Sequence, residues 1–257
     1  MNILEKIGLK TQERINKEKE ILSLEELKNK IDYNKIPDSF KEAFLEPKTN
    51  IIAEIKLASP SEGKISDLNP IDVAKGYLEN GATALSVLTE PYYFNGSTDY
   101  IIKIREKFPK AKILMKDFFV DEYQFYQARF IGANAVLLIV ALLGKDKIKE
   151  FLNLAKKLNL TALVEVHNKE EMEIAIELEA DFIGVNNRNL KDMSISLDTS
   201  INLASLPPKN TILISESGIK TSSDIEILKK YDYKGFLVGT SFMKTEKPWE
   251  KLIKILS

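Results

Sequence analysis

The chain has 257 residues, 44% of them hydrophobic, which is enough apolar material to build a large folded core. Lys and Arg total 37 against 38 Asp and Glu, and the formal charge of −1 gives no reason to expect nucleic acid or an anionic membrane as a partner. Cysteine is absent, which excludes disulfides, thiolate zinc sites and cysteine nucleophiles and favours a reducing compartment.

Residues 1–48 are predicted to form a solvated helical extension. Ile and Leu recur there among dense Lys and Glu, and Pro37 and Pro47 punctuate the end of this segment. No apolar stretch approaches about 18 residues, and the amino-terminal segment carries charges throughout instead of the apolar centre of a signal peptide. We therefore expect a soluble cytoplasmic protein, monomeric or weakly homo-oligomeric, in which residues 1–257 form a single domain.

After Pro47 the sequence alternates between short β-rich runs and amphipathic segments whose apolar residues recur three and four positions apart. Three junctions, NGATALSVL, IGANAVLLI and LEADFIGV, pass from a helix end through small residues into a strand and indicate a weak βα repeat. The predicted strands are 50–56, 84–89, 112–116, 135–140, 162–166, 181–186, 211–216 and 235–239.

This alternation predicts an α/β fold. Eight βα units in roughly 210 residues, with nearly continuous apolar strands, favour a closed parallel (β/α)₈ TIM barrel that carries the N-terminal helical extension. A doubly wound open sheet is the alternative, but no glycine-rich dinucleotide fingerprint follows the first strand.

Polar residues gather at the carboxyl ends of the predicted strands, where barrels of this kind place their chemistry. Glu54 and Lys56 lie on the interior side of the first strand, because the apolar residues that alternate with them take the other side. The polar residues at the ends of the later strands are Lys116, Glu165, His167, Asn186, Arg188, Glu216 and Ser217.

Each of these charges taken alone has a simpler explanation, since Glu and Lys at strand ends are commonly solvated or paired in salt bridges. Taken together they require a network or a ligand, because an uncompensated buried charge costs several kcal/mol against a total stability of about 5–15 kcal/mol. Such a cluster can shift the pKa of a lysine or a glutamate toward neutrality, as proton transfer requires.

Arg188 is one of four arginines in a lysine-rich chain and lies between two asparagines at a strand end. Its planar fork suits a carboxylate, and the alternative is an ordinary surface arginine. His167 is the only histidine, so it can form neither a histidine metal cluster nor a convincing triad, and we assign it a structural or peripheral place.

Two glycine turns follow the last two strands, with Gly218 ahead of a predicted helix and Gly239 followed by Thr240 and Ser241. Together they match the position where these barrels bind phosphate through backbone N–H groups. Taken alone, each is equally well explained as ordinary punctuation between strand and helix.

Eight motifs resemble, in order, those of the indole-3-glycerol phosphate synthase family. They run from residue 51 to residue 243, and the helical extension also resembles that of the family. The motifs are IIAEIKLASPSEG, SVLTEPYYFNGS, LMKDFFVDEYQ, GANAVLLIVALL, LVEVHNKEE, GVNNRNL, LISESGI and LVGTSFM.

The resemblance implies a phosphorylated, anthranilate-derived small-molecule substrate, 1-(2-carboxyphenylamino)-1-deoxyribulose 5-phosphate, and closure of its ring with loss of carbon dioxide and water. Ring closure and loss of the hydroxyl need an acid, whereas rearomatisation needs a base. No metal and no organic cofactor is implied, because proton transfer and the electronics of the substrate suffice. The apolar end of the fourth strand, LLIVALL, could form one side of an aromatic pocket or plain barrel core.

By this resemblance Lys116 is the general acid and Glu165 the general base. Lys56 would bind the substrate carboxylate and share in proton transfer, and Glu54 and Asn186 would orient and polarise the reacting groups. The remaining implied site residues are Ser217, counted with the catalytic groups, Arg188 and Glu216 on the polar wall, and Ser59, Gly218, Gly239 and Thr240 near the phosphate.

Two competing functions stay open at this point. One is another phosphate-binding barrel enzyme such as phosphoribosylanthranilate isomerase, whose catalysis resembles a cysteine and aspartate pairing that a chain without cysteine cannot supply. The other is a barrel that binds a phosphorylated metabolite without converting it. The polar loop 58–70 is long for a βα connection, and we predict that it is a mobile lid.

Overall fold

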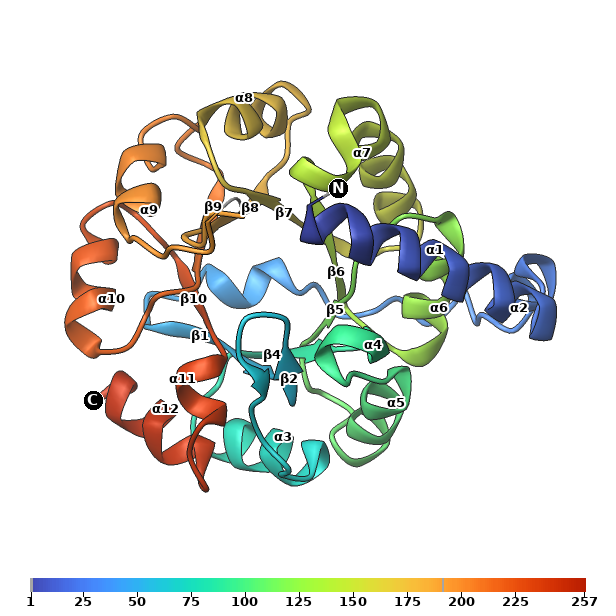
Figure 1. The fold of residues 1–257 in the computed structure, drawn as a ribbon, viewed down its shortest axis with the longest axis horizontal. Helices are drawn as coiled ribbons and strands as arrows, with labels where there is room; N and C mark the ends of the chain where they lie inside the picture. The colour runs from blue at the N-terminus through green and yellow to red at the C-terminus, as the bar shows by residue number, and fades with distance from the viewer. Residues whose placement is uncertain (1, 191) are drawn as a thin grey trace.

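Eight parallel strands close into a barrel in the computed structural model, which describes residues 2–190 and 192–257 and leaves Met1 and Lys191 outside the description (Figure 1). The order around the barrel is β1, β10, β9, β8, β7, β6, β5, β4, and β4 pairs with β1 to close it. The strands are β1 Asn50–Ile55, β4 Ala84–Leu88, β5 Ile113–Lys116, β6 Ala135–Ile139, β7 Thr161–Val166, β8 Phe182–Asn186, β9 Ile212–Glu216 and β10 Gly235–Val238.

The (β/α)₈ prediction is confirmed, and every predicted strand lies within one residue of the observed one at each end. The expected facing of the first strand is also confirmed. Ile52 packs in the cluster that fills the barrel, whereas Ile51 and Ala53 pack in the cluster between the strands and the helices. Glu54 and Ile52 are two residues apart and therefore point to the same side of the strand.

Helices follow the strands around the outside of the barrel. Several have side-chain caps, such as Asp121 and Gln124, which form a reciprocal capping box at the start of α6. The helices are α1 Ile3–Ile21, α2 Leu24–Asn29, η1 Lys41–Phe44, α3 Pro70–Glu79, α4 Pro91–Phe94, α5 Thr98–Lys107, α6 Glu122–Ile131, α7 Val140–Lys157, α8 Lys169–Glu177, α9 Asp198–Leu203, α10 Ser222–Lys229, α11 Thr240–Met243 and α12 Pro248–Leu256.

The N-terminal extension contacts both ends of the barrel. Helix α1 lies across α6 and α7, as Figure 1 shows, on the side where the strands end. Phe40 and Phe44 pack at the opposite end against Phe182, the first residue of β8, with ring centroids 5.9 and 5.4 Å from it. The extension is therefore helical as predicted, but part of it is buried against the barrel instead of solvated.

The loop 58–70 contains a short antiparallel hairpin, β2 Ala58–Ser59 with β3 Gly63–Lys64. Glu62 at its tip forms an ion pair of 2.8 Å with Lys244, just beyond α11. Its mobility stays a prediction. Among the helices of residues 2–190 and 192–257, none is long and apolar enough to cross a membrane.

Candidate active site

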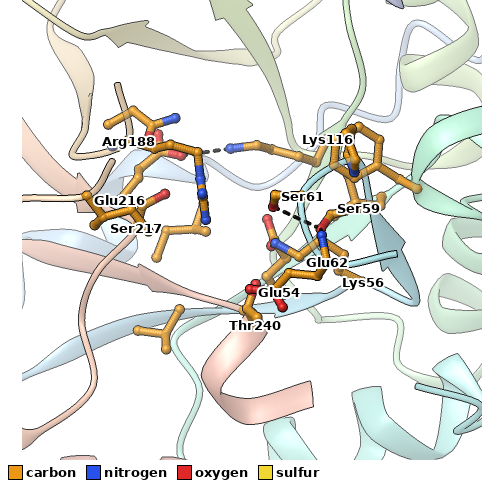
Figure 2. A pocket seen from close by; sticks show the side chains of 18 of the residues that line it. Glu54, Lys56, Ser59, Ser61, Glu62, Lys116, Arg188, Glu216, Ser217 and Thr240 are labelled. Atoms are coloured by element: carbon orange, nitrogen blue, oxygen red, sulfur yellow. Dashed lines mark hydrogen bonds and ion pairs between the residues drawn. The ribbon is translucent and has the colours of Figure 1, made fainter. Parts of the chain in front are cut away.

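One cavity of about 780 Å³ opens at the carboxyl ends of the strands, and the twelve residues predicted from the sequence as catalytic or substrate-binding groups all line it. Figure 2 shows the labelled charged side chains directed into this cavity. The twelve residues are Glu54, Lys56, Ser59, Lys116, Glu165, Asn186, Arg188, Glu216, Ser217, Gly218, Gly239 and Thr240.

Lys116, the last residue of β5, lies between two buried carboxylates. Its Nζ is 2.7 Å from Glu216 Oε2 and 3.3 Å from Glu165 Oε2. The side chains of both glutamates are less than 10% exposed, so all three charges are largely withdrawn from water. An ion cluster this dry is tolerable only because each carboxylate faces a cation.

The two carboxylates that share Lys116 are shifted in opposite directions. Burial raises the pKa of Glu216 to about 7, and the neighbouring Glu165 and Glu54 carboxylates add to the effect, against the opposing charge of Lys116. Burial also raises the pKa of Glu165, but Lys116, His167 and a hydrogen bond from Asn186 outweigh it and hold that pKa well below the usual range.

The difference lies in the second oxygen of each group. Glu216 Oε1 is buried and has no hydrogen-bond partner among the described residues, whereas Glu165 Oε1 lies 3.3 Å from His167 Nε2. The expected shift toward neutrality therefore holds for Glu216. It is wrong for Lys116, because the facing carboxylates outweigh burial and raise the pKa of this lysine.

Glu54 and Lys56, the two charges of the first strand, pair with each other. Lys56 Nζ lies 2.6 Å from Glu54 Oε1, and Ser86 Oγ approaches Glu54 Oε2 at 3.5 Å. Burial raises the pKa of Glu54, but Lys56 and Lys116 overcome it and lower that pKa below its ordinary value. The salt-bridge explanation considered from the sequence is thus correct for this pair, which nevertheless faces the cavity.

Two glycines make room for the buried carboxylates. A Cβ atom on Gly239 would lie 2.3 Å from Glu54 Oε1, and a Cβ atom on Gly184 would lie 2.1 Å from Glu216 Oε1. The φ angle of Gly239 is negative (−128°), so no left-handed backbone explains the glycine, whereas the nearby carboxylate of Glu54 leaves no space for a Cβ atom. Sequence reasoning missed Gly184, whose signal was a glycine inside an otherwise bulky strand.

The chain turns sharply after β9, where the backbone is left-handed at both Ser217 (φ 65°) and Gly218 (φ 84°). Asn187 braces this turn, because its buried Nδ2 donates to the carbonyl of Ser217 at 3.0 Å and to Ser215 Oγ at 2.9 Å. Its Oδ1 accepts from the hydroxyl and the backbone N–H of Ser200. Only the flanking Asn186 and Arg188 were selected from the sequence.

Arg188 lines the cavity but is bound to the backbone of its own loop. Its Nη1 donates to the carbonyl of Met193 at 3.3 Å, and its backbone N–H donates to Asn186 Oδ1 at 3.0 Å. The second bond fixes the amide of Asn186, so that its Nδ2 is left to reach Glu165.

Apolar side chains line another part of the cavity wall. Leu137 and Ile139 of β6 contribute to it, as the LLIVALL motif suggested, together with Phe94 and Phe118, whose rings are tilted by 38° with centroids 5.8 Å apart. Sequence reasoning missed the contribution of helix α1, which supplies Ile3, Leu4 and Ile7.

Helix α1 is also tied to the end of β5, next to Lys116. Arg14 Nη2 lies 2.8 Å from Asp117 Oδ2, and Asp117 directly follows Lys116. Thr89 donates to the same carboxylate oxygen at 2.7 Å, and the backbone N–H of Phe118 donates to the other at 2.8 Å. In the part of the chain that the structure describes, no group of three or more His, Asp or Glu side chains is arranged to hold a metal ion.

Solved structures with the same architecture include 3-hexulose-6-phosphate synthase from Salmonella typhimurium. It has a TM-score of 0.65 and 16% sequence identity, and the match covers 80% of this chain and 96% of that one. Tryptophan synthase subunit alpha from Legionella pneumophila has a TM-score of 0.62 and 12% identity, over 84% and 94% of the two chains. At these identities the likeness shows the barrel fold alone.

Sequence comparison is more specific. Indole-3-glycerol phosphate synthase from Endomicrobium trichonymphae is 44% identical over 253 residues, which cover 97% of this chain and 98% of the relative. The enzyme of the same name from Lachnoclostridium phytofermentans is 42% identical over 256 residues and 94% of each chain. The family model described as indole-3-glycerol phosphate synthase matches residues 4–255. With the barrel, the cavity and the charged cluster in place, the chain belongs to the indole-3-glycerol phosphate synthase family.

Proposed function

We propose that the protein converts 1-(2-carboxyphenylamino)-1-deoxyribulose 5-phosphate into indole-3-glycerol phosphate, carbon dioxide and water. The observation that carries the proposal is the position of Lys116, a protonated amine held between two buried carboxylates on the wall of a cavity that apolar side chains also line. Such a site accommodates an aromatic ring and brings an acid and a base to it.

The reaction has a simple proton balance. Bond formation between the ring carbon and the ketone carbon places negative charge on the ketone oxygen, which takes one proton. Carbon dioxide then leaves from the ring carbon that carried the carboxylate. The hydroxyl takes a second proton and leaves as water, while one proton is removed from the adjacent carbon to complete the indole. The site must therefore supply two protons and accept one.

Lys116 is the donor that the geometry favours, because the facing carboxylates raise its pKa and keep it protonated. Glu216 lies 2.7 Å from Lys116 Nζ and has a pKa of about 7, so it is suited to return a proton to the lysine between the two donation steps. Glu165 stays ionised and acts as the base.

Lys56 and Arg188 serve to bind the substrate. Lys56 neutralises the substrate carboxylate until the carboxylate is lost, and Glu54 orients this lysine, because Glu54 Oε1 lies 2.6 Å from Lys56 Nζ. The turn at Ser217 and Gly218 and the segment at Gly239 and Thr240 border the cavity together and form the phosphate side. Ser59 and Arg188 complete that end.

The test is to mix the purified protein with this substrate and follow indole fluorescence, with Lys116→Met alongside. We expect product from the parent and a loss of about 10²–10⁴-fold in kcat for the variant, since a positioned acid contributes that much. Near-normal turnover by Lys116→Met would refute the assignment of the acid. Saturable binding without product from the parent would favour a binding barrel without catalysis.

A further inference from the structure

The two oxygens of the Glu165 carboxylate face different cations. Oε2 lies 3.3 Å from Lys116 Nζ, and Oε1 lies 3.3 Å from His167 Nε2. The second contact is electrostatic, because Nε2 is buried and meets hydrogen-bond geometry with none of the described residues. His167, the only histidine of the chain, is therefore a direct neighbour of Glu165, the proposed base.

The imidazole ring of His167 is fixed from its other side by Glu171, in the first turn of α8. Nδ1 lies 3.0 Å from Glu171 Oε2, and the backbone N–H of His167 donates to the same oxygen at 2.8 Å. Asn168, the N-cap residue of α8, in turn holds Glu171, donating to Oε1 at 2.7 Å and accepting from the Glu171 backbone N–H at 2.9 Å. The cap of α8 therefore sets the orientation of the ring.

This arrangement favours the doubly protonated ring, because a carboxylate faces each nitrogen. Burial lowers the pKa of His167, but Glu165 from β7 and Glu171 from α8 overcome it and raise the pKa to about 10. Lys116 from β5 and Asn186 from β8 reach the same Glu165 carboxylate. His167 is consequently a fixed cation at neutral pH, buried beside the base.

We propose that His167 is a positioning residue for the reaction, which Glu171 orients and which holds the Glu165 carboxylate in place and ionised. The inference rests on the proposed function, since it gives His167 a part in that chemistry. It replaces the structural or peripheral place that the sequence alone suggested. His167 would not touch the substrate, and its effect would pass entirely through Glu165.

The sole histidine makes a direct test possible. In untagged protein labelled with ¹⁵N-histidine, one imidazole is observed by NMR across a pH titration. We expect both ring nitrogens to stay protonated through pH 8, about 1.5 units above the ordinary midpoint. Glu171→Gln should lower the midpoint. Its matched control is Glu26→Gln, which removes a similar helix-capping glutamate on α2 and should leave the signal unchanged. A midpoint near 6.5 in the parent would overturn the inference.

The second test is the pH profile of kcat/KM for His167→Gln, which keeps a polar side chain and loses the charge. Removing an opposite charge at this distance raises a carboxyl pKa by about 1–3 units, so the acid limb of the profile, which Glu165 places below the usual carboxyl range in the parent, should move to higher pH by that amount. Equal loss of activity at every pH, with the acid limb of the kcat/KM profile unchanged, would indicate a merely structural role and refute the proposal. Absence of turnover in the parent would instead overturn the proposed function, whatever the titration shows.

Discussion

Replacement of Gly184 by alanine should inactivate the enzyme through a single misplaced carboxylate. The added Cβ would lie 2.1 Å from Glu216 Oε1 and 3.2 Å from Leu163 Cδ1. Because heavy atoms prefer separations of about 3.5 Å or more, the carboxylate must move by about 1 Å, whereas Leu163 needs to give only a few tenths of an ångström. That movement lengthens the 2.7 Å contact between Glu216 and Lys116.

The expected magnitudes separate catalysis from folding. A misplacement of about 1 Å in a catalytic constellation costs on the order of 10²-fold in rate, so kcat should fall by that factor. Overpacking a buried strand costs about 1–3 kcal/mol in the free energy of unfolding. Steady-state kinetics and urea denaturation of Gly184→Ala measure the two quantities on the same preparation.

Gly235→Ala is the matched control. Gly235 begins β10 at the far end of the barrel, where a Cβ would lie 2.6 Å from Ile214 Cδ1 and 2.7 Å from Phe44 Cδ1. This variant should lose similar stability and keep its kcat, because no carboxylate is displaced. The claim that Gly184 leaves the space needed by the Glu216 carboxylate would be refuted if Gly184→Ala retained the parental kcat. It would also be refuted if kcat fell equally in both variants.

Two further predictions concern stability. Arg14→Leu should lower the free energy of unfolding in urea by about 3 kcal/mol, because it leaves Asp117 buried without its cation. The control is Lys10→Ala, which removes the exposed ion pair with Glu13 on the same helix and should lower the free energy of unfolding by less than about 1 kcal/mol. Equal losses of stability in the two variants would contradict the reasoning. Folding raises the pKa of Glu216 from 4.5 to about 7, so its contribution to stability is present below pH 4.5 and is lost as the pH rises through 7. Glu216→Gln should therefore gain stability relative to the parent across that window, and a constant difference in urea midpoints would count against the shift.

The barrel could be predicted from the sequence because its signals are local. Strand length, apolar runs and the alternation with amphipathic helices each depend on a few neighbouring residues. The convergence of the polar residues on one cavity was predictable for the same reason, since a parallel barrel brings all strand ends to one rim. Residues as distant in sequence as Glu54 and Thr240 can thus be assigned to one cavity from the sequence alone.

The docking of α1 was not predictable in this way. Its apolar residues are spaced as on any amphipathic surface helix, and nothing local states which surface they will cover. The buried contact between Arg14 and Asp117 joins residues 103 positions apart. Ile3, Leu4 and Ile7 likewise reach the cavity only because the whole helix crosses α6 and α7. A segment predicted to be solvated from its charge density therefore contributes part of the cavity wall.

The unequal behaviour of two glutamates shows most clearly where sequence reasoning ends. Glu165 and Glu216 both occur at strand ends and both face Lys116. What separates them is the second oxygen, which in Glu165 faces the clamped His167 and in Glu216 faces space that Gly184 leaves open. One carboxyl is thereby kept ionised and the other titrates near neutrality. Two carboxyl groups with different protonation states are thus made from the same residue type by what lies within 3.5 Å of a single atom, which is a property of the fold and not of the motif.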